Sequence, residues 1–326
     1  YGAGIRNEKV YGRHLKERKP VDFLGKKKIF FIVSIILCLA GPVMMGVNHA
    51  RGIGAMNYSL DFVGGTSTNV TFDKEYTLEE IDSQMIPSLE EITGDKNIQV
   101  QTVKDSNQVV FKTQTLDLEK REALASYLNE NYGVEASDIA TENISSTVSS
   151  EMRRDAVIAV IIATICMLLY IWFRFKDIRF ATSAVVALMH DVLVVLGFYV
   201  IARVSVGNTF IACMLTIVGY SINGTIVIFD RIREALATKS RTEDLKDLVN
   251  RCITQTLTRT IYTNFTTFVM VVALYILGVS SIKEFAAPLM VGIVCGGYSS
   301  VCVTGALWYV MKTKVGKKAQ PKKKKK

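Results

Sequence analysis

The chain has 326 residues, of which 49% are apolar, and it carries a formal net charge of +9. The apolar residues stand in long blocks, which excludes an ordinary soluble protein and indicates a chain that crosses a membrane several times. The sequence shows no nucleophile–base pair, metal-ligand cluster or nucleotide-binding loop. We therefore expect no enzyme, no cofactor and no bound metal.

The chain begins with a basic segment, residues 1–28, which precedes a first apolar block at Ile29–Val47. About 20 apolar residues are needed to cross a bilayer as a helix. The block follows a long basic segment and is too long for the apolar region of a cleavable signal peptide. We therefore predict a first transmembrane helix at 29–47.

Residues 48–150 have the composition of a water-exposed domain, and their elements alternate between strand and helix. Thr77 and Glu80 match a capping box at a helix start, and Gly133 is suited to a helix end. The order β-α-β-β-α-β is that of a ferredoxin-like fold. The expected elements are strands at 67–72, 97–103, 108–114 and 139–145, with helices at 77–93 and 116–133.

This domain holds no catalytic constellation, so a docking or spacer role is favoured. The alternative is contact with a passing polypeptide by strand addition at an exposed sheet edge.

Residues 151–311 contain five further apolar blocks, which predict an α-helical membrane protein with six transmembrane helices and an external α+β domain. The fifth block is short, and its polar upstream turn from about Thr254 can extend it. A loop at 230–253, with an amphipathic surface helix from Asp230 to Asn250, and a lysine-rich tail at 312–326 complete the chain. The five blocks are approximately 156–173, 181–202, 209–229, 264–278 and 286–311.

Lysine and arginine collect in four segments: before the first span, after the second, after the fourth, and in the tail. With six spans, all four fall on one side of the membrane, so both termini are predicted to be cytoplasmic in a bacterial cytoplasmic membrane. The tail is expected to be a solvated end; contact with anionic lipid or ribosomal RNA is the alternative, and nucleic acid is not expected as a partner. The six cysteines, five of them in spans, are interpreted as small apolar fillers.

His190 and Asp191 stand in the middle of the third span. A charge at the centre of a membrane helix costs about 2.5–3.5 kcal/mol on the insertion scale, so the pair needs a reason to be there. One interpretation is a proton-binding or gating pair. The other is a hydrogen bond from Asp191 to a neighbouring span.

Two further spans carry polar faces at helical spacing. Arg259 belongs to the face in the fifth span and is expected to point into the bundle; snorkelling to the cytoplasmic edge is the alternative. Gly292 and Gly296 in the sixth span predict close helix packing. The polar faces consist of Thr209, Thr216, Tyr220 and Asn223 in the fourth span, and Gln255, Arg259, Tyr262, Thr263 and Thr266 in the fifth.

Four stretches resemble the SecF family, one half of the SecD–SecF accessory complex of the Sec protein-export channel. The resemblance runs in order from Asp61 through the sixth span, and "EMRRDAVIAV" at the start of the second span also fits. The stretches are "LDFVGGT" after the first span, "ALMHD" in the third, "GYSIN-TIVIFDRIRE" in the fourth and "QTLTRTIYTNFTT" entering the fifth.

The resemblance implies half of a bundle of the resistance-nodulation-division (RND) type, which pairs with SecD and uses the proton-motive force to help draw preproteins out of the channel. Implied partners are SecD, the SecY–SecE–SecG channel, YajC, YidC, the translocating preprotein and membrane lipids. The resemblance also implies a hinge where the first span meets the external domain, because glycine permits a tight turn. It further implies a cytoplasmic motif at Asp230 and Arg231. The hinge residues are Asp61, Gly64, Gly65 and Thr66.

One residue departs from the family pattern, which has an aspartate directly after Asn223, where this chain has Gly224. That aspartate and the arginine matching Arg259 belong to the implied proton path, and glycine cannot bind a proton. Three explanations stay open: Asp191 carries the titration, SecD supplies the carboxylate, or this chain is uncoupled. The implied proton-path residues are His190, Asp191, Asn223, Gly224 and Arg259.

Two alternative functions remain open from the sequence. The chain could be a non-transporting scaffold that stabilises SecD and the channel. It could also be an RND-type half-exporter of small lipophilic molecules, although drug pumps of this type usually have far larger external domains.

Overall fold

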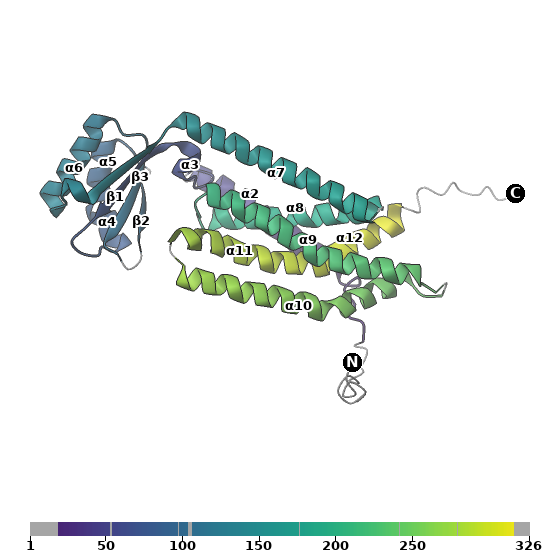
Figure 1. Ribbon diagram of the computed structural model, residues 1–326. Helices are drawn as coiled ribbons and strands as arrows, with labels where there is room; N and C mark the ends of the chain where they lie inside the picture. Colours follow the sequence, from purple (N-terminus) through teal and green to yellow (C-terminus); the bar gives the residue numbers. More distant parts are fainter. Residues whose placement is uncertain are drawn as a thin grey trace, which may run out of the picture.

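Among the residues that the structure describes, six helices are long and apolar enough to cross a membrane, which confirms the predicted number of spans. The computed structural model describes residues 19–52, 54–96, 98–103, 106–175, 177–240, 242–278 and 280–315, so most of the basic N-terminal segment and of the lysine tail lies outside the described residues. The helices run side by side as an elongated bundle with a small sheet domain at one end (Figure 1). The spans are α2 (Lys27–Ala50), α7 (Ser146–Phe175), α8 (Ile178–Ile201), α9 (Asn208–Ala237), α10 (Leu245–Leu277), and a sixth made of α11 (Ser280–Tyr298), the π-helical turn η2 (Ser299–Thr304), α12 (Gly305–Val310) and the π-helical turn η3 (Met311–Val315).

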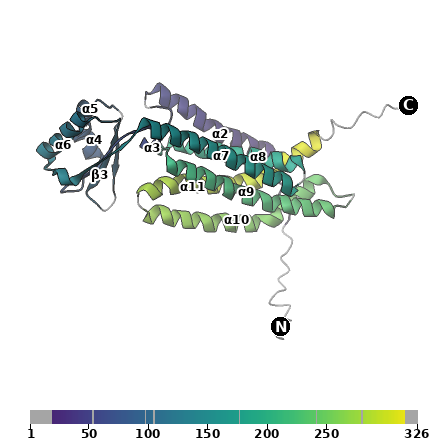
Figure 2. The same cartoon turned by 45° about the horizontal axis from the view of Figure 1, so that its top comes forward.

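Burial within the chain divides these helices into a centre and a periphery. In the apolar stretches of α8, α9 and the sixth span, 50%, 44% and 61% of the residues are buried, against 11%, 6% and 11% in α2, α7 and α10. The helix α10 lies at an edge of the bundle in both views (Figures 1 and 2). The three peripheral helices therefore present most of their surface to lipid or to a partner.

The sheet domain has the ferredoxin-like order that the sequence predicts. Its four strands are antiparallel and lie in the order β2-β3-β1-β4, so β1 pairs with the strand before and the strand after α6. The helices cover one face, and the buried core includes Val70, Ile81, Phe111 and Leu128. The elements are β1 (Gly65–Thr71), α4 (Leu78–Gln84), α5 (Ile86–Thr93), β2 (Gln99–Thr102), β3 (Gln108–Thr113), α6 (Leu118–Tyr132), the 3₁₀ turn η1 (Ala136–Asp138) and β4 (Ile139–Ile144).

The first helix of this domain starts as predicted but is broken in the middle. Thr77 and Glu80 form the capping box at the start of α4. The predicted single helix 77–93 is wrong, because the chain divides into α4 and α5 at Met85, with Pro87 in the first turn of α5. Proline lacks the N–H that would bond to the carbonyl four residues earlier, so the helical hydrogen bonding is interrupted just before Pro87.

Small residues set how closely the spans pack. A side chain on Gly292 would lie 2.5 Å from Ile217, and one on Gly296 would lie 3.2 Å from Ser221, both on α9. The predicted packing role of these glycines is therefore confirmed. A second close contact, between Gly41 of α2 and Gly197 of α8, was not predicted; a Cβ on Gly41 would lie 2.8 Å from the Gly197 Cα.

The end of the bundle opposite the sheet domain is built from prolonged spans. The predicted surface helix from Asp230 to Asn250 is wrong, because α9 continues to Ala237 and α10 begins at Leu245. Helical hydrogen bonding simply continues beyond the apolar residues, and the charged side chains of this region project from the ends of two spans. The turn between them is therefore short.

Candidate functional site

Asp191 lies in the middle of α8 and is completely buried, with 0% of its side chain exposed. Its Oδ2 accepts hydrogen bonds from the hydroxyls of Ser221 on α9 and Ser299 at the start of η2, the latter over 2.7 Å. Its Oδ1 accepts a hydrogen bond from the thiol of Cys295 on α11 over 3.2 Å. Several donors thus compensate for the loss of water around a buried carboxylate. The alternative interpretation of Asp191, a hydrogen bond to a neighbouring span, is therefore present. The bonds to Asp191 join α8 to α9 and to the sixth span.

His190 and Cys295 complete a buried cluster around this carboxylate. The His190 Nδ1 lies 2.9 Å from Asp191 Oδ1 and 3.8 Å from the Cys295 sulfur. Among the described residues, His190 Nε2 has no hydrogen-bond partner. Imidazole, carboxylate and thiol are ligand types that zinc uses, and these atoms lie within 4.8 Å of one another. Their contacts are already hydrogen bonds, so the cluster is held together without an ion. The interpretation of Cys295 as an apolar filler was wrong.

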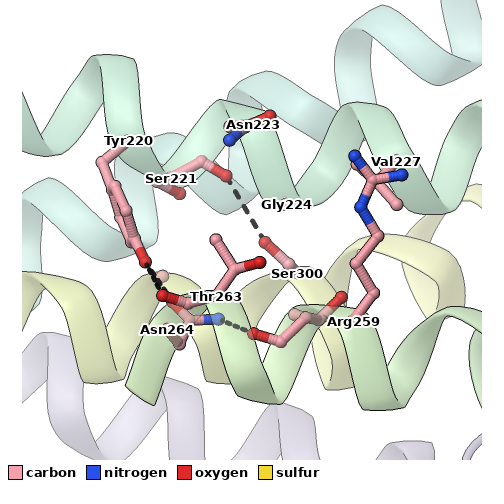
Figure 3. A pocket seen from close by; sticks show the side chains of 11 residues that line it. Tyr220, Ser221, Asn223, Gly224, Val227, Arg259, Thr263, Asn264 and Ser300 are labelled. Carbon is pink, nitrogen blue, oxygen red and sulfur yellow. Dashed lines mark hydrogen bonds between the residues drawn. The ribbon is translucent and has the colours of Figure 1, made fainter. Parts of the chain in front are cut away.

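A polar pocket of about 80 Å³ lies next to this cluster, between α9, α10 and α11 (Figure 3). Ser221 forms part of its wall and also donates to Asp191. One hydroxyl group therefore separates the pocket from the buried carboxylate. The lining residues are Tyr220, Ser221, Asn223, Gly224, Val227, Arg259, Thr260, Thr263, Asn264, Gly296 and Ser300.

Hydrogen bonds hold the polar face of α10 against α9 at this pocket. The Tyr220 hydroxyl donates to the Asn264 side-chain oxygen over 3.0 Å, and the Asn264 amide nitrogen donates to the Thr260 carbonyl over 2.8 Å. These contacts orient the Asn264 side chain and determine which faces of α9 and α10 lie against each other (Figure 3). Of the predicted polar face in the fourth span, Tyr220 and Asn223 line the pocket, whereas Thr209 and Thr216 do not.

Gly224 lies in the wall of the pocket and packs directly on the sixth span. A Cβ at this position would lie 2.8 Å from the Ser300 hydroxyl oxygen. Ser300 in turn lies 3.3 Å from the Thr225 hydroxyl and donates to the Ser221 carbonyl over 3.4 Å. The space that a side chain at 224 would need is therefore partly filled by a serine.

Arg259 reaches from α10 across the pocket toward Gly224 and Val227 on α9 (Figure 3). Within the part of the chain that the structure describes, its guanidinium forms no hydrogen bond or ion pair. Arg259 and Asn223 are both exposed in the isolated chain. Arg259 thus lines a pocket beside the fourth span and is exposed there in the isolated chain.

The sixth span departs from α-helical geometry at the residue that binds Asp191. From Ser299 to Thr304 it is π-helical, and the Thr304 hydroxyl donates to the Ser299 carbonyl over 3.0 Å. Single π-helical turns inside α-helices are rare and occur often at functional sites. The turn orients both Ser299, toward the carboxylate, and Ser300, toward the pocket.

The glycine motif lies where the short helix α3 (Leu60–Val63) meets β1. Gly64 and Gly65 have φ of 81° and 146°, which glycine adopts readily. The buried Thr66 hydroxyl donates to the Asn143 side-chain oxygen over 2.6 Å and accepts from the Leu116 N–H over 2.8 Å. The side chain of Asp61 lies outside the described part of the structure.

Asp230 and Arg231 lie at the charged end of α9, far from the buried cluster in the fold. Asp230 pairs with Arg174 of α7 over 2.9 Å and with Arg233 over 3.2 Å. Arg231 pairs with Glu234 over 2.7 Å and donates to Gln255 of α10 over 2.8 Å. These pairs join the ends of three spans.

The comparisons with known proteins agree with one another. The family model described as "Protein export membrane protein SecD/SecF, C-terminal" matches residues 124–314. The chain is 35% identical to the "Protein translocase subunit SecF" of Calditerrivibrio nitroreducens, over 92% of this chain and 96% of that protein. The chain belongs to the SecD/SecF family.

Other members of the SecD/SecF family are longer. The chain is 36% identical to the "Protein translocase subunit SecDF" of Bacillus subtilis, over 91% of this chain and 39% of that protein. The crystal structure of SecDF, described as a translocon-associated membrane protein from Thermus thermophilus, aligns with a TM-score of 0.76 and 34% identity, over 92% of this chain and 40% of that one. The chain thus spans about 40% of these SecDF proteins.

The structure of this SecD/SecF family member divides the predicted proton-path residues between two neighbouring places. Asn223, Gly224 and Arg259 line the pocket, while His190 and Asp191 lie behind its wall. The sequence did not single out the serines and the cysteine that surround the carboxylate. Serine and cysteine are common in membrane helices and give no signal by themselves. Only the position of Ser221 beside Tyr220 and Asn223 could have indicated that Ser221 belongs to the site.

Proposed function

We propose that this chain is the SecF-type subunit of a protein-translocase accessory complex and that it couples proton movement to the export of preproteins. The names of its relatives and its alignment with a translocon-associated SecDF support the first part. One observation carries the second: a fully buried carboxylate, Asp191, is linked through a single serine to a polar pocket that holds Arg259. Ionisable groups at bilayer depth commonly mark proton and ion pathways.

In this proposal Asp191 takes the proton in this chain, because Gly224 has no group that can. A proton reaching the pocket binds the Ser221 oxygen while Ser221 passes its own hydroxyl proton to Asp191 Oδ2. The charge on Asp191 is neutralised and the hydroxyl is regenerated. Arg259 lines the pocket through which the proton arrives in this proposal.

Protonation changes the hydrogen bonding that holds three spans together. Asp191 Oδ2 now accepts from both Ser221 and Ser299. A protonated carboxyl oxygen becomes a donor and cannot keep both bonds as they are. The link from α8 to α9 or to η2 must then change, and the π-helical turn is the element that can rearrange with it.

The energy available is sufficient for such a switch. Moving one elementary charge through 100 mV corresponds to about 2.3 kcal/mol, which shifts a two-state equilibrium about fiftyfold. The helices α2 and α7 flank the sheet domain in the sequence and would transmit the rearrangement to it.

The proposed complex places SecD on the face formed by α9 and α10. Arg259, Asn223 and Tyr262 are exposed there in the isolated chain, and a cation left facing lipid would be costly. The channel components SecY, SecE and SecG, together with YajC, YidC and the preprotein, are the further proposed partners. We also propose a cytoplasmic membrane location with cytoplasmic termini, because more of the described basic residues, among them Arg174, Arg231 and Lys246, lie at the helix ends and turns opposite the sheet domain than at the ends beside it.

The decisive experiment compares Asp191→Asn with Thr216→Ala in membrane vesicles that contain SecD and the channel. Asparagine keeps the size and an acceptor oxygen but cannot bind the proton, whereas the Thr216 hydroxyl donates to the Ala212 carbonyl of its own helix. We expect Asp191→Asn to abolish the part of the export rate that depends on the proton-motive force and to keep the remainder. Copurification with SecD shows that the variant still assembles. An unchanged dependence on the proton-motive force would refute the proposed role of Asp191.

A scaffold function is the second candidate, and two observations favour it. Gly224 removes a titratable group, and the carboxylate cluster is closed by hydrogen bonds. If Asp191→Asn and Arg259→Gln both assemble and export like the unaltered chain, the scaffold function is the correct one.

A further inference from the structure

A groove beside α7, at the end of the bundle next to the sheet domain, belongs to none of the sites above. We call it the α7 groove. It encloses about 400 Å³ and is almost wholly apolar. Its lining includes Arg153, Ala156, Val160 and Ile161 of α7, Leu196 of α8 and Phe210 of α9.

The groove exists because α7 stands partly away from the bundle. Only 6% of the apolar stretch of α7 is buried within the chain. The start of the helix is held by the Ser149 hydroxyl, which donates to the Leu60 carbonyl of α3 over 3.2 Å. Beyond that contact, Leu196 of α8 and Phe210 of α9 line the groove together with residues of α7.

One cation lies in the lining, at the end nearest the sheet domain. Arg153 precedes the apolar run of α7 and is exposed, and among the described residues its side chain has no hydrogen bond or ion pair. The next residue, Arg154, is paired with Asp155 over 3.1 Å. From Arg153 to Ile161 the helix rises by about 12 Å, so the groove has one charged end at the membrane boundary and an apolar length below it.

We propose that the α7 groove binds a phospholipid with an anionic headgroup, its phosphate on Arg153 and one acyl chain along Ala156, Val160 and Ile161. The volume lies in the range of small-molecule sites. A membrane always presents this combination of phosphate and hydrocarbon at this depth. A partner helix would instead bury Arg153, and it would need to bring an acid to compensate that charge. The inference does not depend on the proposed function.

The test measures lipid retained by the purified full-length chain in native mass spectrometry. The chain is extracted from vesicles of phosphatidylglycerol and phosphatidylcholine in equal amounts. We expect one preferentially retained phosphatidylglycerol, and a retention about fivefold lower for Arg153→Gln. Arg154→Gln, the same charge change one residue away, should retain lipid like the unaltered chain. Ala156→Trp, which fills the groove and keeps Arg153, should also lose the lipid.

Each arm can overturn the proposal. Equal retention by Arg153→Gln and Arg154→Gln would show that general surface charge holds the lipid. Glycerol phosphate competing as well as phosphatidylglycerol would show an anion site without an acyl chain. A photoreactive residue at Val157 that crosslinks to SecD, rather than to lipid, in the assembled complex would show that a polypeptide covers the groove. Circular dichroism and the elution volume verify that the variants are folded.

Discussion

At the scale of single residues, the arrangement around Gly224 and Asp191 separates this chain from the pattern of its family. The pocket holds an arginine without a carboxylate of its own, and the buried carboxylate is one serine away. The proton chemistry of this chain, as we propose it, therefore depends on Ser221 as a relay. A carboxylate placed directly in the pocket would bypass that relay.

The first prediction concerns Gly224→Asp, alone and together with Ser300→Ala. An aspartate at 224 would face Arg259, but its Cβ would lie 2.8 Å from the Ser300 hydroxyl oxygen and 3.3 Å from the Ser300 Cβ. Overpacking of this kind costs about 1–3 kcal/mol. We expect the single variant to unfold at lower temperature than the double variant, and both to show stronger dependence of export on the proton-motive force.

Thermal unfolding in detergent and export in vesicles are the two measurements. Ser300→Ala alone is the control, because it removes the hydroxyl without adding an acid. If the single and double variants unfold at the same temperature, Ser300 is not the obstacle to a side chain at 224.

At the scale of elements, close helix contacts decide which spans move together. The helices α2 and α8 touch backbone to backbone at Gly41 and Gly197. Near the same helix end, the Asn48 amide donates to the Val200 carbonyl over 3.3 Å. Packing and hydrogen bonds, rather than hydrophobic burial, join helices within a bilayer. We therefore expect α2 to move as one body with α8.

The second prediction tests this contact with Gly41→Val and Gly46→Val. Both changes place the same residue in the same helix, so their helix propensities change equally. A Cβ at 41 would lie 2.8 Å from the Gly197 Cα, whereas none of the described atoms lies within 4 Å of one at 46. We expect Gly41→Val alone to lose about 1–3 kcal/mol of unfolding free energy.

Unfolding of the purified chain by a denaturing detergent provides the measurement. A disulfide between cysteines placed at 48 and 200 reports whether α2 and α8 still lie together. Equal stability of the two variants would show that the glycine contact carries no strain and does not set the spacing of the helices.

At the scale of the whole molecule, the N-terminal segment is fastened to the charged end of the bundle. Asp22 pairs with Lys246 over 3.0 Å, and it accepts hydrogen bonds from the Asn250 amide over 2.9 Å and the Gly25 N–H over 2.8 Å. The Lys246 hydrogen bond, then the Gly25 N–H and Asn250, hold the pKa of Asp22 below its ordinary value of 3.8. A carboxyl whose pKa is lowered by folding stabilises the fold above its ordinary pKa and loses that effect as the pH falls through the lowered one.

The third prediction follows from the lowered pKa of Asp22. At neutral pH Asp22 is ionised, so Asp22→Asn should release the segment and accelerate trypsin cleavage after the exposed Lys26; the Lys19–Pro20 bond is not a trypsin site. Asp247→Asn removes the same charge from an exposed neighbour on α10 and should leave the rate unchanged. In the unaltered chain a pH-stable protease should find the segment protected from neutral pH down to the ordinary pKa of aspartate and exposed only below it. Equal cleavage of both variants would show that the contacts of Asp22 do not hold the N-terminal segment against the bundle.

The sequence predicted the membrane spans well, because each depends on about 20 neighbouring residues. It also predicted the ferredoxin-like order, the capping box at Thr77 and the packing of Gly292 and Gly296. It missed the break at Met85 although Pro87 was visible, because the apolar spacing on both sides suited one continuous helix. It also placed a surface helix where two spans simply continue.

What the sequence determined by itself was which segments cross the membrane and which costly polar residues they carry, since both are properties of local hydrophobicity. Only the tertiary structure decided what those residues touch. Asp191 accepts hydrogen bonds from Ser221 and Ser299, which are 30 and 108 residues away in the chain. No local sequence pattern can predict contacts at such separations. The physical reason is that a buried carboxylate is stabilised by whichever donors the packing of three helices brings to it, and that packing is set by small residues spread over the whole bundle.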